Sequence, residues 1–210
     1  VMRKFHTSFK EKENQMAKIP ARKQVSKKYT WNAESVFKTT KEWDTALKAV
    51  IDGIPNVKKY EGTLSESPKT LLAGIKAIED LSLRAQTVFM YAQFAYAVDT
   101  TNQASGALVG KAQGMFGQVF AAIAFLNPEL LQIGWDQLES WMKSNSQLAA
   151  YRQSFHDLFR QQAHVRSAEV EEILGMAADP FSGPSSSTGM LVNADFKFAP
   201  AKDSKGKKIE

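Results

Sequence analysis

Pro68 to Tyr96 reads PKTLLAGIKAIEDLSLRAQTVFMYAQFAY, and this stretch decides the fold class. Its apolar residues recur at spacings of three and four, which is the period of one face of an α-helix. Ser67 supplies a hydroxyl N-cap, and Pro68 stands at the first helical position. The pattern predicts one helix of roughly thirty residues. Its continuous apolar stripe comprises Leu71, Ile75, Ile78, Leu81, Ala85, Phe89, Ala92 and Tyr96.

A second apolar stripe follows after a short interruption. The segment Asp99-Thr100-Thr101-Asn102 consists of residues that favour caps and turns. Two long helices joined by such a short turn form an antiparallel helical hairpin. On the second helix, glycines at four positions predict close packing against a neighbouring helix: Gly106, Gly110, Gly114 and Gly117. The apolar stripe of this helix comprises Ala104, Leu108, Ala112, Met115, Val119, Ala122 and Leu126.

Flanking segments extend the helical pattern over residues 29–178. Thr40 is a candidate N-cap for a helix that carries Trp43, and Pro55 is expected either to kink this helix or to restart it. Asn127-Pro128 is expected to end the second long helix and to start a short one. We therefore predict a mainly α fold of antiparallel helical hairpins. Apolar periodicity predicts further helices at 135–142, 148–158 and 167–178.

The composition changes after residue 178. Residues 179–190 are rich in Pro, Ser and Gly, which predicts a connector, read either as a surface loop or as an inter-domain hinge. Residues 191–210 show alternation at Phe196 and Phe198, followed by a Gly-containing turn and a short return strand. A lone hairpin is marginally stable. We therefore expect this β-hairpin to be incomplete and to belong to a part of the protein that lies beyond Glu210.

Charge and composition restrict the function classes. The chain has 210 residues, 43% of them hydrophobic, and no Cys, which excludes disulfides and thiolate metal sites within it and fits a cytoplasmic location. The net charge of +5 arises in a basic arm, residues 1–28, which we interpret as a solvated extension and not as a nucleic-acid-binding segment. The longest apolar run, Val119 to Leu126, is too short to span a membrane.

No constellation of residues in this chain indicates catalysis. His6 lies in the basic arm, and His156 and His164 are eight residues apart, roughly 12 Å along a helix, which is too far to share one metal ion. The pair His156-Asp157 is expected on the surface and not as a general base. Glu171-Glu172 lies in a first helical turn, where the helix dipole favours acids. We expect no catalytic, cofactor-binding or metal-ligating residue in the chain.

Several segments, in order, resemble those of the oligoendopeptidase F-type zinc metallopeptidases, relatives of thimet oligopeptidase. Asn32 stands where this family usually has Asp, and Val165-Arg166 replaces a commoner apolar pair. The resemblance is carried by the opening Y-T-W-N-A-E-S-V-F at 29–37 with Trp43, D-T-T-N at 99–102, F-L-N-P-E-L-L at 125–131, R-Q-Q-A-H-V-R-S-A-E at 160–169 and N-A-D-F-K-F at 193–198.

The resemblance implies a hydrolase whose zinc ligands and general-base Glu lie in an H-E-x-x-H segment and a downstream Glu of a C-terminal catalytic domain. None of those positions exists here. It further implies that residues 29–178 are the N-terminal helical domain, one wall of a channel that admits oligopeptides, and inactive without the catalytic domain. The alternative is a free-standing helical protein-interaction module.

Overall fold

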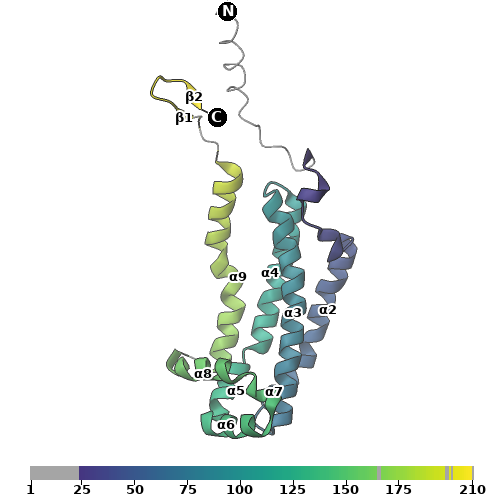
Figure 1. Ribbon diagram of the computed structural model, residues 1–210, viewed down its shortest axis with the longest axis vertical. Coiled ribbons are helices and arrows are strands. Elements are labelled where there is room, and N and C mark those ends of the chain that lie inside the picture. Colours follow the sequence, from purple (N-terminus) through teal and green to yellow (C-terminus); the bar gives the residue numbers. More distant parts are fainter. Residues whose placement is uncertain (1–23, 165–166, 197–198, 200, 210) are drawn as a thin grey trace, which may run out of the picture.

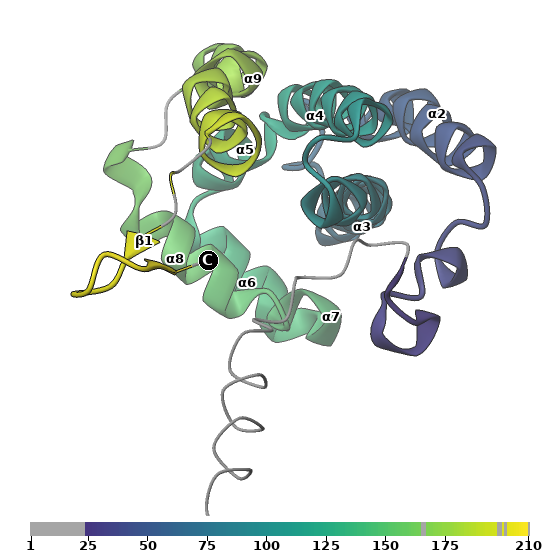
Figure 2. The ribbon, with the colours of Figure 1, turned by 90° about the horizontal axis from the view of Figure 1, so that it is seen from above.

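Long helices running side by side dominate the computed structural model, which describes residues 24–164, 167–196, 199 and 201–209 (Figure 1). Short helices gather at one end of the long ones. Viewed from above, α4 lies between α9 and α2, and α3 packs beside α4 and α2 (Figure 2). The predicted mainly α fold is confirmed. The helices are α2 (Thr40–Lys58), α3 (Pro68–Val98), α4 (Gln103–Ile123), α5 (Leu126–Ile133), α6 (Trp135–Ser144), α7 (Ser146–Ala149), α8 (Arg152–Arg160) and α9 (Ala168–Met190).

The predicted α3–α4 hairpin forms with the caps that the sequence indicates. The Ser67 hydroxyl accepts a hydrogen bond from the Thr70 N–H at 3.0 Å, and Pro68 opens α3. At the other end, the Asn102 side chain accepts from the Ser105 N–H at 3.1 Å and so caps α4. Satisfying these free N–H groups fixes where each helix begins.

Two helix boundaries differ from the prediction, and of the two outcomes left open at Pro55 the structure excludes a restart. The N-cap of α2 is Thr39, whose Oγ1 accepts from the Glu42 N–H at 3.2 Å, and not Thr40. Pro55 lies inside α2, which continues to Lys58 without restarting. α4 ends at Ile123, so Asn127-Pro128 falls in the first turn of α5 and does not end α4. Proline is tolerated there because first-turn N–H groups have no partner within the helix.

The hydrophobic core lies between α2, α3 and α4 and reaches into the short helices. Trp43 is fully buried, and its indole N–H donates to the Val88 carbonyl of α3 at 2.8 Å. Burial of apolar area here supplies the main stabilisation of the bundle. The core includes Val50, Val57, Leu64, Leu71, Leu81, Val88, Met115, Val119, Leu138 and Leu148.

Residues 179–190 are helical, so the prediction of a loop there is wrong. α9 runs through the whole segment to Met190, with Pro180 and Pro184 inside it. Each proline removes a helical hydrogen bond, but both prolines are exposed, so water can satisfy the freed carbonyl groups. The Thr188 hydroxyl also donates to the Pro184 carbonyl at 2.9 Å. Whether the segment connects two domains or acts as a hinge stays a prediction.

The C-terminal hairpin forms, but later in the chain than predicted. Residues Leu191–Asp195 make a π-helical turn where the first strand was expected. The strands in the described part of the chain are β1 (Ala201–Lys202) and β2 (Lys208–Ile209), which pair antiparallel. The turn lies where the sequence places it: the Asp203 carboxylate accepts from the N–H groups of Lys205 and Lys207. Phe198 lies outside the described residues, as do residues 1–23 of the predicted basic arm.

One helical run in the described part of the chain is long and apolar enough to cross a membrane. Gln103–Ile133, which comprises α4 and α5, contains a window of mean hydropathy 1.3 that is 28% buried. The expectation that no segment would reach this length is therefore wrong by this criterion. A core helix passes the same test, and α4 contributes Ala112, Met115 and Val119 to the core. That the protein has no membrane partner stays a prediction.

Candidate functional site

Two of the three histidines, His156 and His164, lie in the described part of the chain. His156 and His164 are exposed, and the His156 ring packs edge-on against Trp135 with ring centroids 5.9 Å apart. His6 lies outside the described residues. Among the residues that the structure describes, no three His, Asp or Glu side chains are grouped closely enough to hold a metal ion. These residues therefore do not fit a zinc centre.

The glycines of α4 do not pack closely against another helix, contrary to the prediction. A Cβ atom built at Gly110, Gly114 or Gly117 would meet nothing within 4 Å, and one at Gly106 would meet only the Tyr96 ring at 3.8 Å. The close approach occurs instead at a glycine of the facing helix. A Cβ at Gly175 of α9 would stand 3.2 Å from the Ala121 backbone nitrogen.

A groove of about 670 Å³ opens between α4 and α9 on the C-terminal side of Gly175. We call it the amide groove, because carboxamide side chains of α3, α4 and their connecting turn line it. The side chains of Gln93 and Gln113 are half-buried. No local sequence pattern indicates this groove, since its two sides are about 80 residues apart in the chain. It is lined by Gln93, Tyr96, Asn102, Gln103, Gly106, Gly110, Gln113, Ser186, Asn193 and Asp195, among others.

A second cavity, of about 590 Å³, lies between α2, α4 and α9, and its α9 residues, Glu172, Met176 and Pro180, stand on both sides of Gly175 in the chain. Gly114 and Gly117 line it together with Met176. At its edge, Lys58 of α2 forms an ion pair with Glu172 of α9 at 3.6 Å. This pair is half-exposed and contributes little to stability. Glu172 is the fifth residue of α9, just past the first turn in which it was predicted, and it pairs with a lysine of another helix.

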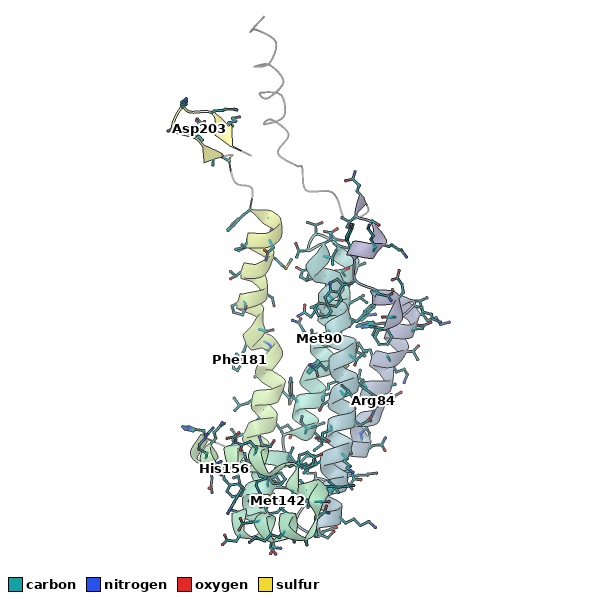
Figure 3. All side chains as sticks on the ribbon, in the orientation of Figure 1. Arg84, Met90, Met142, His156, Phe181 and Asp203 are labelled. Carbon is teal, nitrogen blue, oxygen red and sulfur yellow. The ribbon has the colours of Figure 1, made fainter. Side chains whose placement is uncertain are left out.

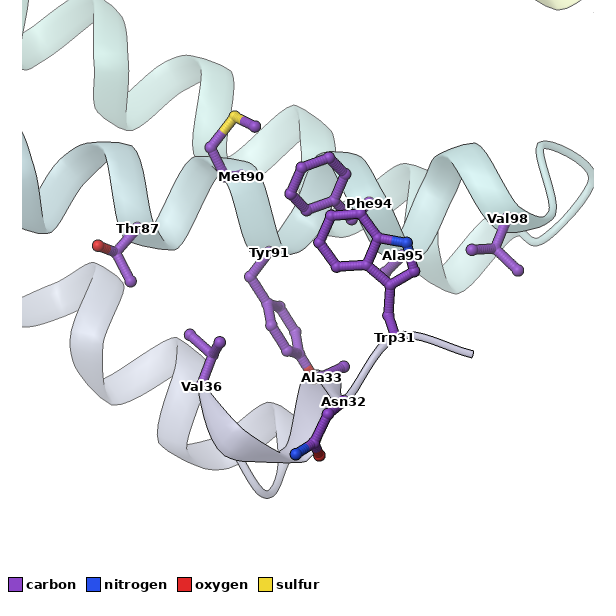
Figure 4. A pocket seen from close by; sticks show the side chains of 10 residues that line it. All are labelled: Trp31, Asn32, Ala33, Val36, Thr87, Met90, Tyr91, Phe94, Ala95 and Val98. Carbon is purple, nitrogen blue, oxygen red and sulfur yellow. The ribbon is translucent and has the colours of Figure 1, made fainter. Parts of the chain in front are cut away.

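A third cavity, of about 360 Å³, lies between the N-terminal segment and α3 (Figure 4). The Trp31 ring leans over Phe94, with ring centroids 3.8 Å apart, and Phe37 packs edge-on against Tyr91. Both Tyr91 and Phe94 line this cavity. Tyr91 also packs against the core.

α9 exposes large apolar side chains along one face. Val170, Leu174 and Phe181 recur at helical spacing, and Leu174 and Phe181 are 49% and 72% exposed. Ile173 beside them is 58% exposed. We call Val170, Ile173, Leu174 and Phe181 the outer face of α9; Figure 3 labels Phe181. Gly175, which points to α4, lies on the opposite side of the helix. Contiguous exposed apolar residues mark a contact surface.

Glu129 has a structural role that sequence reasoning missed. Its carboxylate accepts hydrogen bonds from the backbone N–H groups of Gly62 and Leu64, at 2.5 and 3.3 Å. It thereby ties the turn after α2 to α5. Gly62 has φ of +78°, a conformation that favours glycine. The motif F-L-N-P-E-L-L contains this glutamate, but its partners are about 65 residues earlier, so the sequence alone did not indicate the contact.

Comparison with known proteins identifies relatives for almost the whole chain. A family model described as Oligopeptidase F matches residues 129–198. Oligopeptidase PepF of Bacillus subtilis is 29% identical over 194 residues, an alignment that covers 92% of this chain and 29% of that protein. Group B oligopeptidase PepB of Streptococcus agalactiae is 30% identical over 189 residues, covering 90% of this chain and 31% of that protein.

A solved structure agrees with the sequence comparison. The crystal structure of oligoendopeptidase-F from Enterococcus faecium superposes with a TM-score of 0.74 at 27% identity, covering 81% of this chain and 33% of that one. The chain thus spans about a third of the length of the relatives it matches. It belongs to the oligoendopeptidase F family and corresponds to the N-terminal portion of its members.

Proposed function

We propose that this chain is the non-catalytic helical region of a zinc-dependent peptidase that cleaves oligopeptides, and that it forms one wall of the channel through which peptides reach the catalytic site. The zinc and the residues that bind it would belong to a catalytic domain of the same protein. The relatives are about three times longer than this chain, which leaves room for such a domain.

The outer face of α9 carries this proposal. Its four apolar side chains are uncovered, although a single exposed Leu or Phe would need no explanation. Val170 and Phe181 lie three helical turns apart on one side of α9, so together they form a strip that a partner surface can cover. The opposite side of α9 borders the amide groove. α9 would therefore join the helical bundle to the catalytic domain while its groove side stays open to peptides.

Two steps test the proposal. The first is to read the coding sequence beyond the codon for Glu210, where we expect an H-E-x-x-H segment; a stop codon there would favour the free-standing interaction module. The second is to express residues 1–210 and the downstream polypeptide as separate chains and to purify one by a tag on the other. We expect the two chains to co-purify and to hydrolyse a quenched fluorescent oligopeptide together.

Substitutions on α9 make the second step specific. Changing both Leu174 and Phe181 to Ser should reduce co-purification, because it removes apolar area from the contact. Leu83→Ser is the matched control, since Leu83 is 65% exposed on α3, away from α9. Unchanged co-purification with the α9 variant, or an equal loss with Leu83→Ser, would contradict the assignment of α9 to the domain contact.

A further inference from the structure

We infer that the amide groove binds the main chain of an extended oligopeptide, with little dependence on its side chains. The inference rests on the proposed function, because it assigns the peptide-contacting surface of the same channel wall. It goes beyond that function in naming where on this chain the peptide lies and which groups hold it. The groove's volume of about 670 Å³ is within the range of ligand sites.

The floor of the groove is bare helix backbone. Gly106 and Gly110 lie one turn apart on α4 and both line the groove. Beyond Gly110 there is open space, since a Cβ built there would meet nothing within 4 Å. Glycines cost α4 helix propensity, roughly 1 kcal/mol each relative to Ala. Because these glycines have no side chains, the backbone of a ligand can approach α4 closely. A side chain at position 110 would prevent that approach.

Carboxamides stand around this floor with unused hydrogen-bonding capacity. The side chains of Gln93, Gln103 and Gln113 form no hydrogen bond with any other residue that the structure describes, whereas the Asn102 side chain is used as the cap of α4. Each carboxamide offers two N–H donors and one C=O acceptor. A peptide main chain offers one N–H and one C=O per residue, so it can pair with all three carboxamides whatever its sequence.

The charge of the groove selects among peptides. Asp195 is the only carboxylate among the described lining residues, and none of them is Lys or Arg. An anionic ligand such as a phosphate or a nucleic-acid backbone would therefore meet no cation there. A peptide amino terminus, or a Lys or Arg side chain, can pair with Asp195. We therefore assign the Asp195 end of the groove to a positive group of the peptide.

Fluorescence anisotropy of the 210-residue chain tests the inference. The probe is an unstructured Ala/Ser-rich oligopeptide with a free amino terminus and a fluorescent label at its carboxyl end. We expect saturable binding that Gly110→Leu weakens by about tenfold or more, because the new side chain fills the groove. Gly114→Leu is the matched control: it lies one turn along the same helix, faces equally open space, and lines the second cavity instead.

Two further variants examine the chemistry. Gln113→Ala should weaken binding several-fold, whereas Gln118→Ala, beside the second cavity, should not. Asp195→Asn should weaken binding of the free-amino probe about threefold and leave an N-acetylated probe unaffected. Circular dichroism melting of each variant checks that it folds.

Lack of saturable binding by the unsubstituted chain, or equal losses in the Gly110 and Gly114 variants, would overturn the inference. Either result would leave the co-purification test of the proposed function untouched, so the two failures are distinguishable.

Discussion

Gly175 of α9 lies against the backbone of Ala121 of α4, so close that a Cβ at position 175 would stand 3.2 Å from the Ala121 nitrogen. Two cavities lie along the α4–α9 boundary: the second cavity, which Ala121 lines beside this contact, and the amide groove, further toward the C-terminal end of α9. α9 therefore approaches the α4 backbone closely at Gly175.

Gly175→Leu should displace α9 from α4. The added side chain must push against backbone atoms, which cannot move aside as a flexible side chain can, and the expected cost is about 2 kcal/mol. Hydrogen exchange of the α9 amides is the measurement, and we expect faster exchange over 168–190. Gly189→Leu is the control, because a Cβ there meets nothing within 4 Å. Slow α9 exchange in the Gly175 variant would refute the contact.

Trp43→Phe should destabilise the bundle by about 2 kcal/mol. Trp43 is fully buried, and its indole N–H donates to the Val88 carbonyl of α3. Phenylalanine loses this hydrogen bond and leaves a small void. The free energy of unfolding, measured in urea, reports the loss. Trp31→Phe serves as control: Trp31 is 57% exposed, and its replacement should change stability by less than about 0.5 kcal/mol.

Glu129→Ala should loosen the turn after α2. The carboxylate accepts from the N–H groups of Gly62 and Leu64, and charge-assisted hydrogen bonds of this kind contribute about 1.5–3 kcal/mol in total when partly buried. Glu129→Gln keeps one acceptor oxygen, so it should retain part of the stability. Thermal melts of the two variants compare their stabilities. If alanine and glutamine were equally tolerated, the tie between α5 and this turn would have no energetic role.

Tyr151 should make stability fall at alkaline pH. Burial raises the pKa of its phenol above the ordinary 10.0, and the hydrogen bond to the Glu79 carboxylate at 2.8 Å adds to the rise. The folded chain therefore holds this proton to higher pH than the unfolded chain. The stability difference between the native chain and Tyr151→Phe should be constant below pH 10 and shrink above it. A difference that stays constant up to pH 11.5 would contradict this assignment.

Sequence periodicity predicted the α3–α4 hairpin because two long apolar stripes flank explicit caps at Ser67 and Asn102. It failed at 179–190, where Pro, Ser and Gly favour a loop by local propensity. In the structure this segment is part of α9, a helix that local composition alone does not favour. α9 packs on α4 at Gly175. Tertiary contact overrides propensity in such segments.

The candidate site was less predictable than the fold. The glycines at 106 and 110 were visible in the sequence, but whether they line a groove or a close helix contact depends on how far α9 lies from them. α9 contacts α4 at Gly175, a residue about 65 positions later, which no local pattern relates to α4. Periodicity indicates which face of a helix is apolar; it does not indicate where two helices diverge to leave a groove.

The most direct measurement of the central claim is peptide hydrolysis and zinc content of purified residues 1–210. We propose that this chain binds peptides and shapes the channel, whereas another domain carries out the chemistry. We therefore expect that the chain releases no fluorescence from a quenched oligopeptide and holds no stoichiometric zinc after dialysis against the metal. Chelator-sensitive hydrolysis by the chain, or one bound zinc per chain, would contradict it.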